Sequence, residues 1–415
     1  MRVDFRRVAS YTPVVEAQEI LLTHVHPINR TESISVLDAI GRVAATTIKS
    51  PKDIPPWDSS HMDGFAVRHT DLAGASEEKP VRLGIVGTVR PGTEPQLRLG
   101  PGEAARILTG AYLPEGADTV VPQEEVVVED GWAIFTRRPE AGEFIDRKGF
   151  DLSRGEEIVN RGQVLRPADA TLLAHVGVWY VDVVKRPVVA IMAVGDELTD
   201  DPRQVEKGKI FNTHSHLLKH LVMASGCVPL YIGIQPDELG AVGQAVRKAL
   251  NEADLLLTIA GSSVSEKDVS SQVFTELGAE YFVHGLRLQP GRVGGFALVG
   301  GRPAVLLPGL IMSTLNVFMF LAYPLIRHLQ GLEPRIYHRR VMASLAETVR
   351  FRKYHDFKKV VWVKLRDDGE SVTCHPRLGE SSGMSIPART DGFIVAEPGV
   401  AQLWEGEKVW VNLPP

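Results

Sequence analysis

Apolar residues at helical spacing dominate the first part of the chain. Val14, Ala17 and Leu21 would share one face of a helix, and this pattern predicts helical structure over residues 12–45. The next stretch, 51–60, is rich in proline and cannot form a regular helix, because proline lacks an amide hydrogen and clashes with the preceding turn. The helical region is therefore expected to end before this stretch.

From residue 64 to about 143 the pattern changes to short apolar runs separated by turn residues. The run 124–128 is typical of a strand, and Asp130 followed by Gly131 is typical of a tight hairpin turn. These features predict a small β domain. After it, a short helix is expected over 167–176, which begins with proline at a position where helices tolerate it.

Between residues 187 and 330, continuous apolar runs alternate with amphipathic stretches. The run 188–194 is apolar throughout, as expected of a strand buried on both faces. Such alternation predicts a doubly wound parallel sheet covered by helices on both faces, with ligands bound outside the carboxyl ends of the strands. Strands are expected at 188–194, 228–234, 254–260 and 304–307, and helices at 213–225, 237–253, 268–277 and from Pro308 to near Leu329.

After Pro334 the chain returns to short apolar strands separated by turns, which predicts a small C-terminal β barrel. The expected strands are 341–349, 360–365, 371–375, 392–396 and 408–413. The fold class is therefore α/β plus β in several domains. We expect four parts: a helical and extended domain made of 1–55 and 145–185, an inserted β domain at 56–144, the doubly wound domain at 186–330 and the barrel at 331–415.

Composition narrows the class of protein. The 415 residues suggest about three domains, and 46 basic against 51 acidic residues give a net charge of −5, which disfavours a general nucleic-acid binder. Two cysteines, Cys227 and Cys374, are too few for a disulfide scaffold or a cysteine-rich metal site. The start of the chain shows no secretory signal. The most hydrophobic stretch, 306–326, contains two prolines and fits a buried helix better than a membrane span. We therefore expect a cytoplasmic protein without a membrane span.

Several familiar motifs are absent. The chain has neither a P-loop nor a dinucleotide-binding glycine pattern after a strand. His216 and His220 lie one helical turn apart and could bind a metal, but Leu217 stands where the zinc-protease motif has its glutamate. The pattern favours an exposed helix face over a metal pair.

Carboxylates occur in loops and at strand ends, where they suit a hard divalent cation such as Mg²⁺. Each could alternatively serve a turn or cap a helix. The small-residue loop Gly261-Ser262-Ser263 could cradle a phosphate with its amide groups, or could be a plain connection. The acidic candidates are Asp58, Asp63, Asp151, Asp196, Glu197, Asp237 and Asp268, of which Asp196, Glu197 and Asp237 follow strands of the parallel sheet.

Three segments, 60–66, 106–118 and 195–198, come in the order found in the molybdopterin molybdenumtransferases, the MoeA and gephyrin E-domain family. The chain resembles this family over essentially its whole length, and the stretches 254–268 and 379–395 also fit. The resemblance implies a homodimer of four-part subunits whose doubly wound domain is related to pterin-adenylating enzymes. It implies hydrolysis of adenylylated molybdopterin with Mg²⁺ or Zn²⁺, and insertion of molybdenum from molybdate. Other cofactor-biosynthesis proteins are further candidate partners.

The resemblance also implies roles for particular residues. It assigns catalysis to five of these acids, Asp63, Asp151, Glu197, Asp237 and Asp268, with Asp63, Glu197 and Asp268 as metal ligands. It implies substrate contacts for Thr109, Lys148, Gly261, Ser262, Ser263, Arg292, Ser313 and Ser385.

The sequence departs from the family pattern where anions would be held. Gln289 and Arg292 stand where the family usually has lysines, and Leu310 stands where it has asparagine. A neutral side chain cannot supply the charge that an oxyanion needs. Two interpretations follow: a divergent insertase for molybdate or tungstate, which the retained acids favour, or a non-catalytic molybdopterin-binding paralogue acting as a carrier or sensor. A changed nucleotide or pterin substrate is a third.

Overall fold

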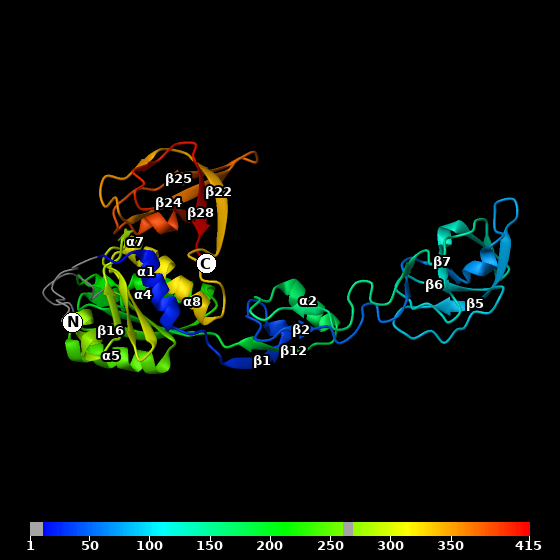
Figure 1. Ribbon diagram of the computed structural model, residues 1–415, viewed down its shortest axis with the longest axis horizontal. Coiled ribbons are helices and arrows are strands. Elements are labelled where there is room, and N and C mark those ends of the chain that lie inside the picture. Colours follow the sequence, from blue (N-terminus) through cyan, green and yellow to red (C-terminus); the bar gives the residue numbers. More distant parts are fainter. Residues whose placement is uncertain (1–10, 260–268) are drawn as a thin grey trace. The chain divides into compact units, whose positions relative to one another are not determined.

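The computed structural model describes residues 11–259 and 269–415, and the chain divides into two compact units (Figure 1). Gly261, Ser262, Ser263 and Asp268 lie outside the described residues. The four-part division expected from the sequence stays a prediction. Unit 1 consists of Met1–Glu32, Gly41–Val43 and Val183–Pro415, and unit 2 of Ser33–Ile40 and Ala44–Asp182.

A six-stranded sheet forms the centre of unit 1. Four strands run parallel, which confirms the predicted doubly wound sheet, and two antiparallel strands extend one edge. The sequence patterns missed these two because antiparallel strands follow no βα alternation. The inner one, Gly295–Val299, is joined to its parallel neighbour by a two-glycine turn, Gly300-Gly301, with φ of 57° and 70°. The strand order is β16 (Val228–Gln235), β13 (Val188–Val194), β17 (Leu255–Ile259), β21 (Arg302–Leu307), β20 (Gly295–Val299) and β18 (Tyr281–His284).

Helices cover both faces of this sheet, because alternate residues of each strand point to opposite sides. Leu257 contributes to the core beneath α1, α4, α7 and α8, whereas Leu256 contributes to the core beneath α5 and α6. The apolar stretch after Pro308 is a buried helix with a π-helical centre, as its composition predicted. The helices are α1 (Val14–His24), α4 (Thr213–Ala224), α5 (Leu239–Glu252), α6 (Val269–Glu276), α7 (Ile311–Val317), η4 (Phe318–Ala322) and α8 (Tyr323–Leu329).

The predicted N-terminal helix is too long. α1 ends at His24, and the helix expected over 12–45 is wrong beyond that point. Val25 is extended, Pro27 follows, and the chain then enters β1 (Thr31–Ser35). The isolated apolar positions after Pro27 fit the helical period by chance, because proline and β-branched residues disfavour helix there.

The C-terminal part of unit 1 is a closed five-stranded barrel, as predicted. In the sheet order β24 (Lys358–Asp367), β25 (Val372–Pro376), β22 (Arg339–Leu345), β28 (Lys408–Leu413) and β26 (Gly392–Ala396), each strand pairs with its neighbour. Pairing of β24 with β26 closes the ring. A short strand of the preceding region, β19 (Leu288–Gln289), pairs in parallel with β24. Beside the barrel strands lie β23 (Val349–Arg350), β27 (Gln402–Leu403) and the short helix α9 (Ser385–Ala388).

Unit 2 contains the expected small β domain and the expected short helix, α2 (Pro167–His175). The hairpin turn at Asp130 and Gly131 has positive φ at both residues, 46° and 81°, as such a turn requires. The sheet order is β7 (Thr119–Pro122), β4 (Gly64–Val67), β6 (Glu103–Ile107), β5 (Val81–Val89), β9 (Trp132–Phe135) and β8 (Val126–Glu129). The other elements are η1 (Val36–Asp38), β2 (Ile48–Lys49), β3 (Ser59–Ser60), η2 (His69–Leu72), η3 (Gln123–Glu125), β10 (Ile145–Asp146), β11 (Glu157–Val159) and β12 (Tyr180–Val184), which pairs with β1.

The two cysteines are free and buried, and burial raises the pKa of both thiols, that of Cys374 to about 11. Among the described helices, none is long and apolar enough to cross a membrane.

Candidate functional site

Two acidic residues meet at the carboxyl edge of the parallel sheet. Asp196 follows β13 and Asp237 follows the neighbouring β16. The amide of Asp196 donates to Asp237 Oδ2 at 3.3 Å, and the amide of Asp237 donates to Asp196 Oδ1 at 3.4 Å. Asp237 is not the cap of α5, because Glu238 takes that position and makes no side-chain cap bond. The strand ends thus bring together the carboxylates that the sheet topology predicted.

Glu197 lies in an excursion that leaves and rejoins this edge. Its carboxylate folds back over Gly195, where an added Cβ would lie 2.7 Å from Glu197 Oε2. The excursion contains β14 (Leu198–Thr199), α3 (Pro202–Val205) and β15 (Ile210–Phe211), and β14 pairs with β15. The exposed carboxylate of Glu197 is therefore held near the end of β13 by backbone structure.

Asp200 fixes this excursion to the sheet. Tyr231 Oη on β16 donates to Asp200 Oδ2 at 2.6 Å, and the buried amide of Asn212 donates to Asp200 Oδ1 at 3.2 Å. Desolvation and the neighbouring carboxylate raise the pKa of Tyr231, which keeps its hydroxyl protonated as a donor. In the described portion, no three His, Cys, Asp or Glu side chains form a group that could hold a metal ion by themselves. The His216 ring instead stacks on Phe211, with centroids 5.4 Å apart.

In unit 2, Asp63 and Thr109 form a bonded pair. Asp63 Oδ1 accepts the Thr109 amide and the Thr109 hydroxyl, both at 2.7 Å. These hydrogen bonds lower the pKa of Asp63, so its carboxylate stays ionised. The residue after Asp63 has to be glycine, because a Cβ added at Gly64 would lie 2.2 Å from the Val121 carbonyl oxygen. The two sequence motifs that contain Asp63 and Thr109 are therefore joined in space.

Lys148 and Asp151 lie in another loop of unit 2. Lys148 Nζ lies 3.5 Å from Asp53 Oδ2, and the Lys148 amide donates to Asp58 Oδ1 at 2.8 Å. Asp151 is exposed, and its amide donates to the Ile54 carbonyl at 3.0 Å. The charge of Lys148 is thus partly matched by a carboxylate before any ligand arrives.

A cationic site lies where β19 meets the barrel. Gln289 pairs directly with Lys359 of β24, and Arg292 follows three residues after Gln289. The Lys359 side chain is buried, with the residue only 4% exposed, and burial lowers the pKa of its ammonium. Within the described ranges, no carboxylate lies within 4 Å of the charged nitrogens of Lys359 or Arg292. Asp356 acts on Lys359 from farther away and partly offsets the lowering of its pKa. A buried and an exposed cation without a carboxylate in contact are features of a candidate anion site.

The loop that carries Arg292 is anchored to both sides. Asn316 Nδ2 donates to the Pro290 carbonyl at 2.9 Å, and Trp362 Nε1 on β24 donates to Asn316 Oδ1 at 3.0 Å. Gln289 Oε1 is buried and has no hydrogen-bond partner, so an acceptor stands unused beside the Lys359 position. The amide that replaces the usual lysine therefore supplies no charge.

The other substrate candidates surround α7 and α9. Leu310, 48% exposed, takes the cap position of α7 without a side-chain bond, and Ser313 on α7 is buried. Ser385 begins α9 and is exposed. The amide of Met312 donates to the Ser381 carbonyl at 3.0 Å, which ties the loop before α9 to α7.

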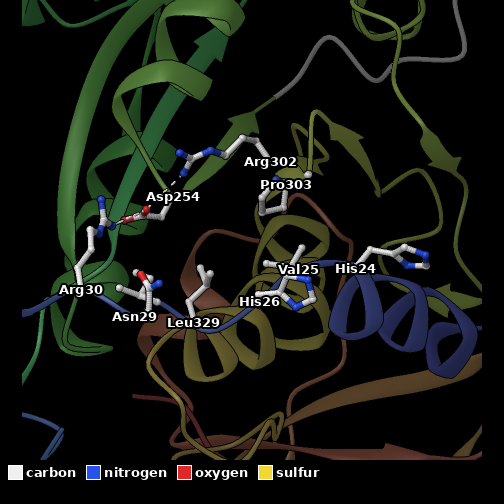
Figure 2. A pocket seen from close by; sticks show the side chains of 11 residues that line it. His24, Val25, His26, Asn29, Arg30, Asp254, Arg302, Pro303 and Leu329 are labelled. Atoms are coloured by element: carbon white, nitrogen blue, oxygen red, sulfur yellow. Dashed lines mark hydrogen bonds and ion pairs between the residues drawn. The ribbon is translucent and has the colours of Figure 1, made fainter.

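A cavity of about 450 Å³ lies at the opposite, amino-terminal edge of the sheet (Figure 2). There Asp254 at the start of β17 binds Arg30, with Nη2 2.6 Å and 2.7 Å from its two oxygens, and Arg302 lies 3.5 Å away. Asp254 also accepts the Val188 amide at 2.9 Å. This cluster joins the segment after α1 to the sheet, and the described sequence-predicted site residues do not line the cavity.

Comparison with known proteins extends this picture. Family models match the MoeA N-terminal region (domain I and II) over residues 12–177, a probable molybdopterin binding domain over 190–328 and the MoeA C-terminal region (domain IV) over 345–413. The molybdopterin molybdenumtransferase of Bacillus subtilis is 31% identical over 97% of this chain and 94% of its own length. That of a Nostoc species is 34% identical over 78% of this chain and 76% of its own.

The chain belongs to the molybdopterin molybdenumtransferase family. It is therefore an enzyme of molybdenum cofactor biosynthesis. A solved molybdopterin biosynthesis MoeA protein from Pyrococcus horikoshii is 31% identical, covers 98% of this chain and 100% of its own, and has a TM-score of 0.86. A protein of the same pathway from Pyrococcus furiosus, 19% identical with a TM-score of 0.60, shares the fold.

Lys359 is a candidate site residue of this molybdopterin molybdenumtransferase that sequence reasoning missed. The signal was present, because Lys359 has the same strand parity as Val361 and Val363, which face the barrel core. A lysine at an inward position of an apolar strand is unusual. The pairing that brings it opposite Gln289 joins distant parts of the chain, and no local pattern predicts it.

Proposed function

We propose that the protein hydrolyses adenylylated molybdopterin, releases AMP and inserts molybdate-derived molybdenum into molybdopterin. We further propose that Arg292 and Lys359 hold the oxyanion. The observation that carries this proposal is the buried ammonium of Lys359 without a carboxylate partner in the described structure. A buried cation is costly unless an anion compensates it, and molybdate is a dianion with oxygens on every side. Tungstate has the same shape and charge, and the site should accept it too.

The acids suit a divalent cation. Asp196 and Asp237 offer hard oxygen donors at one strand edge, and this donor type fits Mg²⁺ better than Zn²⁺, which prefers nitrogen and sulfur. We propose that Glu197 and Asp237 hold or orient the cation and the attacking water, and, as a separate proposal for unit 2, that the ionised Asp63 takes part in the same reaction. Bound there, the cation would neutralise charge on the phosphates.

The chain's own groups then have separate tasks. A carboxylate at the strand edge accepts the proton of the water that breaks the phosphoanhydride, and the adenosine monophosphate half leaves. Arg292 and Lys359 keep the oxyanion close to the molybdopterin, as Ser313 and Ser385 would by hydrogen bonds. The positive charge that Gln289 lacks would come from Lys359 on the neighbouring strand.

The test uses pure protein, adenylylated molybdopterin, Mg²⁺ and molybdate, with AMP release and molybdate affinity as readouts. Lys359→Met should weaken molybdate binding about tenfold or more, because a hydrogen bond to a charged group contributes roughly 1.5–3 kcal/mol. Lys364→Met on the same strand is the control, since Lys364 is 46% exposed and pairs with Asp391 at 2.6 Å. Equal affinity in all three proteins would refute the oxyanion site, and absence of AMP release by the wild type would refute the reaction.

A further inference from the structure

One residue holds both cations of the proposed oxyanion site. Arg292 Nη1 donates to the Tyr354 hydroxyl oxygen, and Lys359 Nζ donates to the Tyr354 carbonyl oxygen. The Tyr354 ring also faces both charges, with its centroid 5.3 Å from the Arg292 guanidinium carbon and 5.6 Å from Lys359 Nζ. Tyr354 thus contacts both cations with two oxygens and an aromatic face. A bound anion would contact the same cations with its own oxygens.

The surroundings keep Tyr354 in this position. Its φ is 54°, in the left-handed region that a residue of this size seldom adopts. Phe357 donates its amide to the Tyr354 carbonyl at 3.0 Å and packs against the ring at 5.0 Å between centroids. Phe357 is itself buried and packs on Tyr11. Unusual backbone conformations held by packing cluster at ligand sites.

The contacts of Tyr354 are ones that a bridging ligand would have to replace. In the part of the chain that the structure describes, the Arg292 guanidinium and the Lys359 ammonium donate to the two oxygens of Tyr354. An oxyanion that bridges the two cations through Arg292 Nη1 and the same N–H of Lys359 has to displace both contacts, whereas one bound through their remaining N–H groups would leave them in place. Bridging in this way therefore exchanges neutral oxygens for charged ones.

We propose that Tyr354 is a specificity-determining residue that competes with the oxyanion for Arg292 and Lys359. This inference rests on the proposed function of that site. Competition lowers the affinity for every anion, and those with several charged oxygens can replace both contacts while simple anions cannot. The free enzyme would then keep the buried Lys359 and the exposed Arg292 hydrogen-bonded without binding chloride.

Calorimetric titration of molybdate tests this competition. Tyr354→Phe keeps the ring but frees Arg292, and should bind molybdate about tenfold more tightly than the wild type. Tyr354→Gly, which tolerates positive φ and removes the whole side chain, should also bind more tightly. Tyr337→Phe is the matched control, because its ring lies 5.3 Å from the Arg335 guanidinium carbon and 5.2 Å from that of Arg340. Its affinity should not change.

The outcomes separate this inference from the proposed function. Weaker binding by Tyr354→Phe would mean that the hydroxyl helps to hold the ligand, and unchanged binding by both Tyr354 variants would mean that it does not compete; either result overturns the inference alone. Lys359→Met is included in the same series. If it binds molybdate as tightly as the wild type, or if neither the wild type nor the Tyr354 variants bind, the oxyanion site itself is refuted.

Discussion

At the scale of single residues, the site depends on where charges are left uncompensated. Asp237 at a strand end and the Asp63 motif could be read from the sequence, because sheet topology and loop position fix where such residues lie. Lys359 could not, because its importance comes from burial and from pairing with Gln289 across distant parts of the chain. Leu310 is exposed at a helix cap, so its contact with ligand stays a prediction.

Asp63→Asn should abolish Mg²⁺-dependent AMP release and leave thermal stability nearly unchanged. The asparagine oxygen can still accept both hydrogen bonds from Thr109, but the negative charge is lost. Asp71→Asn is the control, because Asp71 Oδ2 similarly accepts the Gly102 amide at 3.0 Å in the same unit. AMP release at the wild-type rate by the Asp63 variant would show that this carboxylate has no part in the reaction.

Oxyanion affinity should decrease as the pH becomes alkaline, and the decrease should begin at a lower pH than it would if the anion were held by an exposed lysine. Burial lowers the pKa of Lys359, so the charged form that binds the anion is present below the lowered value and is lost as the pH rises through it. Lys359→Arg should move the alkaline fall to higher pH, since arginine stays protonated. Titrating molybdate into both proteins between neutral and strongly alkaline pH checks the shift. Identical profiles would contradict it.

At the scale of elements, prediction succeeded where one signal dominated. The strands β26 and β28 occupy the ranges their apolar patterns predicted. The N-terminal helix was overextended because apolar spacing was followed past Pro27, and β18 was missed because an antiparallel edge strand follows no βα alternation. Local patterns thus predict elements better than the pairing that joins them.

Gly64→Ala should destabilise unit 2 by about 1–3 kcal/mol, the usual cost of forcing atoms into a packed site. The added Cβ would lie 2.2 Å from the Val121 carbonyl oxygen on the neighbouring strand, so β4 would have to move. Gly74→Ala, where nothing lies within 4 Å of the added atom, should be nearly neutral. Thermal unfolding of the two variants decides the comparison, and equal melting temperatures would show that the sheet yields easily.

At the scale of the whole molecule, we expect a homodimer with twofold symmetry. The resemblance to the family implies this assembly, and twofold dimers are the commonest closed assembly. Unit 2 also exposes Leu37, Trp179 and Tyr180, at 69%, 59% and 72%, and the Val36 amide donates to the Trp179 carbonyl at 3.0 Å. These neighbouring apolar side chains favour a covered surface.

Light scattering at micromolar concentration should give twice the chain mass of 45.5 kDa. Trp179→Asp should shift the mass toward the monomer if this surface is the interface, whereas Trp132→Asp, 44% exposed on β9, should not. A monomeric wild type would refute the dimer, and an unaffected Trp179 variant would move the interface elsewhere.

The buried cysteines have a practical consequence for following the reaction. Alkylating reagents attack the thiolate, and both native thiols are shielded from solvent and strongly favour the protonated form. The native cysteines of the folded enzyme should therefore not react with a maleimide dye at neutral pH. A cysteine introduced at the exposed Ser385 would then be the one position that takes the dye, and its fluorescence could report the arrival of an oxyanion in real time.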